Sequence, residues 1–175
     1  LGKTVMNTYA RSHLRKEVLI GGVSNAFFNG WIAWLLLRDG PDLSWSGEHS
    51  FVPDVLATAF LLPLIVALIV IPLQRSKLRK GKLQAIELTS GTRLHGFVQR
   101  FPAGVGKNSL VFGLLGVALF APVILLGVYI AGIASFTPAA YAAFKGVWAG
   151  VLAGALVVPM VLVALREPVL VSPAQ

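Results

Sequence analysis

Four long apolar runs alternate with polar segments along the chain. The longest run covers residues 139–165, in which Lys145 is the only charged residue. About 20 apolar residues suffice to cross the hydrocarbon core of a bilayer, and backbone groups within lipid must be hydrogen-bonded inside their own segment. The pattern therefore predicts four transmembrane helices, over residues 18–37, 53–73, 109–133 and 139–165.

The polar segments between these runs differ in length. The longest, residues 74–108, is expected to be a loop that carries one short amphipathic surface helix over about residues 92–101. Leu94, Phe97, Val98 and Phe101 have the spacing of a single helix face, which we expect to rest in the headgroup layer. The connection 134–138 is short, so the third and fourth helices are expected to be antiparallel neighbours.

Composition agrees with this pattern. The chain has 175 residues, of which 56% are hydrophobic and 13% charged, and its mean hydropathy is +0.78. A soluble domain usually carries about 25% charged residues. We therefore expect an all-α integral membrane protein with a single membrane domain over residues 1–175. There is no cysteine, which excludes disulfides and thiolate metal sites.

The distribution of Lys and Arg predicts the orientation of the helices. Four of these residues precede the first helix, eight lie in residues 74–108 and one follows the fourth helix. Residues 38–50 contain one and residues 134–138 none. Because positive charge favours the cytoplasmic side, both termini and the long loop are predicted to be cytoplasmic. The net charge of +8 is thus attributed to topology and not to nucleic-acid binding.

The overall pattern is similar to that of many small four-span proteins of bacterial inner membranes, which is the expected location. No stretch matches a family signature.

Small residues recur every four positions in two of the predicted helices. Such a stripe allows another helix to approach to backbone contact, so we expect both stripes to be helix-packing faces. The partner is another helix of this chain, a second copy or a different membrane protein. The residues are Gly22, Ala26 and Gly30 in the first helix and Gly146, Gly150 and Gly154 in the fourth.

Four polar residues within the apolar runs are candidates for chemistry. Asn25 and Asn29 share a helix face, and either line a polar path or form hydrogen bonds between helices. Asp54 and Lys145 are both predicted near the non-cytoplasmic face. They are boundary residues, an ion pair or a proton-coupled transport site.

The basic loop has a second predicted role beside setting topology. Its cations are expected to bind anionic lipid headgroups, each contributing about 1 kcal/mol. The residues are Arg75, Lys77, Arg79, Lys80, Lys82, Arg93 and Arg100.

Catalytic and cofactor signatures are absent from the sequence. His13, His49 and His95 all lie outside the apolar runs, which argues against an intramembrane haem or transition-metal site. Residues 104–109 contain glycine, lysine and serine without the full spacing of a phosphate-binding loop. We therefore expect no cofactor, no metal and no enzymatic activity.

Two functions remain as hypotheses. The leading one is a non-catalytic accessory, assembly or structural subunit that packs against a larger membrane complex through its small-residue helix faces. The alternative is a small homodimeric, permease-like carrier with a polar path near Asn25, Asn29 and Asp54.

Overall fold

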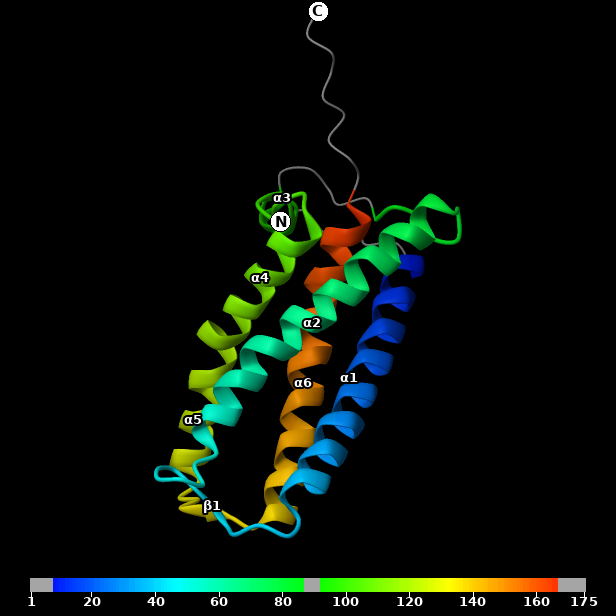
Figure 1. The fold of residues 1–175 in the computed structure, drawn as a ribbon. Helices are drawn as coiled ribbons and strands as arrows, with labels where there is room; N and C mark the ends of the chain where they lie inside the picture. Colours follow the sequence, from blue (N-terminus) through cyan, green and yellow to red (C-terminus); the bar gives the residue numbers. More distant parts are fainter. Residues whose placement is uncertain (1–7, 87–91, 167–175) are drawn as a thin grey trace, which may run out of the picture.

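The computed structural model describes residues 8–86 and 92–166, and within them four helical spans lie alongside one another (Figure 1). Each span is long and apolar enough to cross a membrane, which confirms the mostly helical, four-span architecture. The third span consists of three helical pieces in direct succession. The elements are α1 (Thr8–Leu37), α2 (Val52–Arg79), α4 (Val105–Leu115), the π-helix η1 (Gly116–Phe120), α5 (Ala121–Ile130) and α6 (Pro138–Leu165).

Two helices extend beyond the apolar runs that predicted them. α1 begins at Thr8 instead of residue 18, and α2 continues to Arg79 instead of ending at residue 73. Polar side chains such as Arg and Lys are good helix formers, so a fall in hydropathy does not by itself end a helix. The basic residues Arg75 and Lys77 therefore lie in the last turns of α2, and not in a loop.

The third span contains a wider helical turn at η1, immediately before Pro122. Proline cannot donate a backbone hydrogen bond, and its ring crowds the carbonyl of the preceding turn. A π-turn has a different hydrogen-bond pattern, with bonds between residues five apart, and so accommodates the proline. Gly116 begins this turn and lies against the backbone of Ala59 in α2. The third span begins at Val105 and ends at Ile130, four residues earlier and three residues earlier than predicted.

The packing order differs from the expectation for the third and fourth helices. α6 packs against α1 and α2, whereas the third span packs mainly against α2. The connection after α5 forms the strand β2 (Ser135–Phe136), which pairs antiparallel with β1 (Leu43–Ser44). The chain passes through β2 before α6 begins. α5 and α6 are therefore not packed against each other, although the connection between them is short.

The expected short helix is present as α3 (Arg93–Gln99), with the side chain of Thr92 accepting a hydrogen bond from the backbone N–H of His95. Of its predicted apolar face, Val98 and Phe101 are buried within the protein and Phe97 is exposed. Two of the four residues of that face therefore pack within the protein, and its position relative to the headgroup layer stays a prediction.

The two ends of the bundle are distinguished by their small elements (Figure 1). The α3 end holds α3 with the start of α1 and the ends of α2 and α6. The opposite end, which we call the ribbon end after its two-stranded β-ribbon, contains the β1–β2 pair and the start of α6.

Burial is uneven among the four spans. In the most apolar 18-residue window of each span, 67% of residues are buried in α6 but only 6% in α1, with 33% in α2 and 28% in the third span. The core is thus built around α6, and α1 covers one side of it.

Candidate functional site

A cluster of three polar side chains lies at the ribbon end. Lys145 Nζ donates to Asp54 Oδ1 at 2.6 Å, and Tyr141 Oη donates to Asp54 Oδ2 at 2.5 Å. Asp54 lies in the first turn of α2, where the helix dipole favours an anion. Tyr141 and Lys145 are four residues apart in α6 and so share a face. Both carboxylate oxygens are satisfied, and α2 is tied to α6.

The cluster is half-buried. The ring of Tyr141 is fully buried, while the side chains of Lys145 and Asp54 retain 14% and 39% of their exposure. Breaking a deeply buried pair costs about 3 to 5 kcal/mol, whereas exposed pairs contribute about 0 to 1 kcal/mol. This pair lies between those limits. It is both a link between helices and accessible to a solute.

A cavity of about 420 Å³ opens onto the cluster. Its size is within the range of small-molecule sites, about 300 to 1,000 Å³. The loop before α2 adds a carboxylate and an imidazole to its wall, from Glu48 and His49. With the ammonium, phenol and carboxylate of the cluster, these groups can hydrogen-bond a small polar or charged solute. The apolar part of the lining comes from the last turns of α1, Ala33, Leu36 and Leu37, and from Pro41 and Leu43 after it.

Tyr141, Glu48 and His49 were not predicted from the sequence. The signal for Tyr141 was its position one turn before Lys145. Glu48 and His49 carried no such signal. They line the same cavity as Asp54 because of the conformation of the loop before α2, which the sequence does not show.

Asn25 and Asn29 do not join this site. The amide of Asn25 donates to Gly21 O at 2.7 Å and that of Asn29 donates to Asn25 O at 2.9 Å, both within α1. Neither residue lines the cavity at Asp54. Within the described residues, the two asparagines and Asp54 therefore do not line one common cavity.

The two small-residue stripes lie against each other. A Cβ added to Gly150 would be 2.8 Å from Gly22 O, and one added to Gly146 would be 2.9 Å from Ala26 O. Gly30 packs nearly as closely, since its added Cβ would be 3.2 Å from Ala142 O and 3.3 Å from the Cα of Gly146. α1 and α6 therefore touch backbone to backbone. The contact is looser at Gly154, where an added Cβ would meet Val18 at 3.6 Å.

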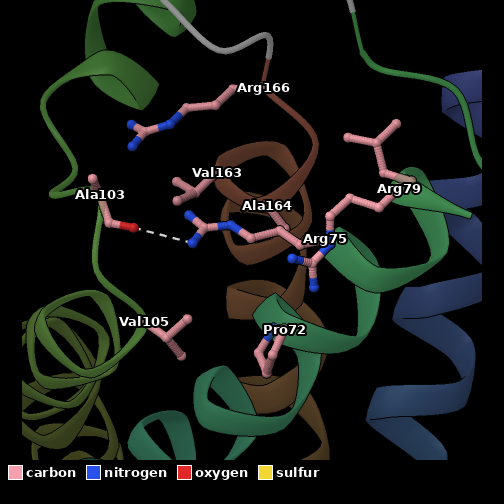
Figure 2. Close-up of a pocket in the computed structure, with 9 residues that line it drawn as sticks. Pro72, Arg75, Arg79, Ala103, Val105, Val163, Ala164 and Arg166 are labelled. Atoms are coloured by element: carbon pink, nitrogen blue, oxygen red, sulfur yellow. Dashed lines mark hydrogen bonds between the residues drawn. The ribbon is translucent and has the colours of Figure 1, made fainter.

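The predicted headgroup ligands gather at the α3 end. Arg75, Lys77 and Arg79 lie in the last turns of α2, and Lys80 and Lys82 directly follow it. Arg93 begins α3 and Arg100 caps its C-terminus. Figure 2 shows that Arg166, from the end of α6, joins Arg75 and Arg79 at one cavity. Arg166 was not among the predicted ligands.

No three His, Cys, Asp or Glu side chains of residues 8–86 and 92–166 come together as a metal site. No known protein family, curated protein or solved structure matches the chain, so the geometry of these sites carries the functional argument.

Proposed function

We propose that the protein is a non-catalytic accessory subunit, which packs against a larger membrane complex through the outward side of α1. The observation that carries the proposal is the broad exposure of the outward side of α1, which is lined by aromatic and apolar side chains. α1 is the least hydropathic of the four spans and also the least buried. A partner that covers the outward side of α1 would bury these exposed side chains in a protein contact.

The outward side of α1 has the composition of a protein interface. Phe27, Phe28 and Trp31 are all at least half exposed, and Phe27 stacks on Trp31. Aromatic residues are enriched where proteins bind one another. The small-residue faces pack within the chain, so the proposed partner surface is this aromatic side and not the glycine stripes.

The polar groups of the spans also support a non-catalytic role. Asp54 is bonded to Lys145 and Tyr141, and both asparagines of α1 are bonded to their own helix. These groups have structural partners within the chain.

Extraction of the full chain in a mild detergent, followed by mass measurement, tests this proposal. We expect an assembly with unlike subunits. The double variant Phe27→Ala/Trp31→Ala should be released from that assembly. The control Leu119→Ala/Leu126→Ala, at positions 56% and 57% exposed in the third span, should remain in it. A wild-type protein found only as a monomer or homodimer contradicts the proposal, as does equal retention of both variants.

The second candidate, a small homodimeric carrier, is favoured by the cavity at Asp54. Its test is uptake of amino acids, sugars and organic cations into proteoliposomes that contain the purified chain. Under this proposal Asp54→Asn abolishes uptake of one solute class without changing the oligomeric state. Absence of uptake for every class, with correctly inserted protein, contradicts it.

A further inference from the structure

A second cavity, of about 460 Å³, lies at the α3 end between the ends of α2 and α6 and the start of α4 (Figure 2). Its wall is of two kinds. One part is apolar and the other consists of three arginine side chains, one from α6 and two from α2. The apolar residues are Pro72, Leu78, Ala103, Val105, Val163 and Ala164, and the arginines are Arg75, Arg79 and Arg166.

Two of the arginines are held in place by backbone carbonyls. Arg75 Nη1 donates to Ala103 O at 3.0 Å, the bond drawn in Figure 2. Arg166 donates to the carbonyls of Val98, Phe101 and Pro102 at 2.9 to 3.2 Å. These bonds orient the guanidinium groups without neutralising them. A guanidinium carries five N–H donors in a planar fork, so both groups retain donors for a ligand.

The three positive charges have no acidic partner among the described residues. The ion pairs found there join other residues, and the side chain of Arg79 forms no hydrogen bond or ion pair with residues 8–86 and 92–166. Arg166 and Arg79 both lie close enough to Arg75 for their positive charges to repel its guanidinium group. An anion in the cavity would relieve this repulsion, and Arg forks match phosphate oxygens geometrically.

The apolar part of the cavity wall indicates that the bound anion also carries a hydrocarbon group. Val163 and Ala164 of α6 are buried and form the floor of the cavity. Its accessible apolar residues are Pro72 and Leu78 of α2, with Val105 at the start of α4. A ligand that fills the whole cavity needs a phosphate at the arginines and hydrocarbon along this wall. An anionic phospholipid has both parts, while a soluble phosphate has only the first.

We propose that this cavity binds the phosphodiester group of an anionic phospholipid, held by Arg75, Arg79 and Arg166, with an acyl chain along the wall formed by α2 and the start of α4. This inference does not depend on the accessory role proposed above. The sequence predicted a broad basic surface that attracts lipid headgroups. The proposed site is instead one defined cavity, and Arg166 is one of its ligands.

Native mass spectrometry of the purified full chain, titrated with phosphatidylglycerol or phosphatidylcholine, tests the proposal. The decisive variant is Arg79→Gln, because Arg79 makes no bond within the described fold. The matched control is Arg100→Gln, which removes the same charge from an exposed residue outside the cavity. We expect phosphatidylglycerol to bind about tenfold more weakly to Arg79→Gln, as for loss of one charge-assisted hydrogen bond, and no such change in Arg100→Gln.

Three results would overturn the proposal. Equal weakening by Arg79→Gln and Arg100→Gln would indicate diffuse attraction to the basic surface. Equal binding of phosphatidylglycerol and phosphatidylcholine would show that the arginines do not select an anion. If inorganic phosphate or glycerophosphoglycerol binds as tightly as the lipid, the ligand is a soluble phosphate and the acyl-chain assignment is wrong.

Discussion

α1 and α6 form the most extensive helix contact of the described fold, yet they are held in place very differently. α6 is buried on several sides, packs against both α1 and α2, and is joined to α2 by the Asp54–Lys145 pair. α1 packs mainly against α6, through the contact of its small-residue stripe with Gly146 and Gly150, here called the seam. Most of its other residues are exposed, and a hydrogen bond between His13 and Gln74 joins it to α2. The difference indicates that α6 is the centre of the bundle, while the position of α1 depends mainly on the seam.

The largest expected effect comes from filling that seam. At Gly150 even a Cβ would lie 2.8 Å from the backbone oxygen of Gly22, and a backbone atom cannot move aside as a side chain can. Gly150→Leu should therefore lower the free energy of unfolding in detergent by about 1 to 3 kcal/mol, the usual cost of overpacking. The control Gly127→Leu adds the same side chain where an added Cβ meets nothing within 4 Å. Equal stability of the two variants would show that the seam does not hold α1.

A smaller effect is expected from the link between α6 and α2. Lys145→Met leaves Asp54 without its cation, and for this half-buried pair we expect a loss of about 1 to 2 kcal/mol, between the values for buried and exposed pairs. The double variant Lys145→Met/Asp54→Asn should lose less than the sum of the two single variants. The measurement is a double-mutant cycle of unfolding free energies in detergent. Additive losses would indicate that the two residues act independently.

The smallest effect on stability is expected from single cysteines placed at the two ends of the bundle. These variants test the orientation of the helices in the membrane. Single cysteines at Ser46 and Lys80 should react with an impermeant thiol reagent from opposite sides of the membrane. Both residues are exposed. Gly81 is unsuitable because its φ of +67° would strain a cysteine. If Ser46 and Lys80 react from the same side, the predicted side of each end is wrong. The predicted cytoplasmic position of both termini then fails with it.

The sequence by itself determined the number and type of the spans. The requirement of a bilayer for about 20 apolar residues with internal backbone bonding is local, so it can be read from each run alone. The short α3 was also predictable, because its apolar spacing and the proline after Phe101 are local signals. Helix ends were less predictable. Arg and Lys continue a helix as readily as apolar residues do, and α2 accordingly reaches Arg79.

Only the tertiary structure decided which surfaces meet. The spacing of Gly146 and Gly150 indicated a bare helix face, but a bare face accepts any helix, and its partner α1 lies more than 100 residues earlier in the chain. Asp54 and Lys145 are 91 residues apart, and their pairing requires α2 and α6 to be packed side by side. Arg166 likewise became part of a cavity because the carbonyls at the end of α3 lie across from it. Contacts of this kind depend on the relative placement of whole helices, which no local pattern of side chains contains.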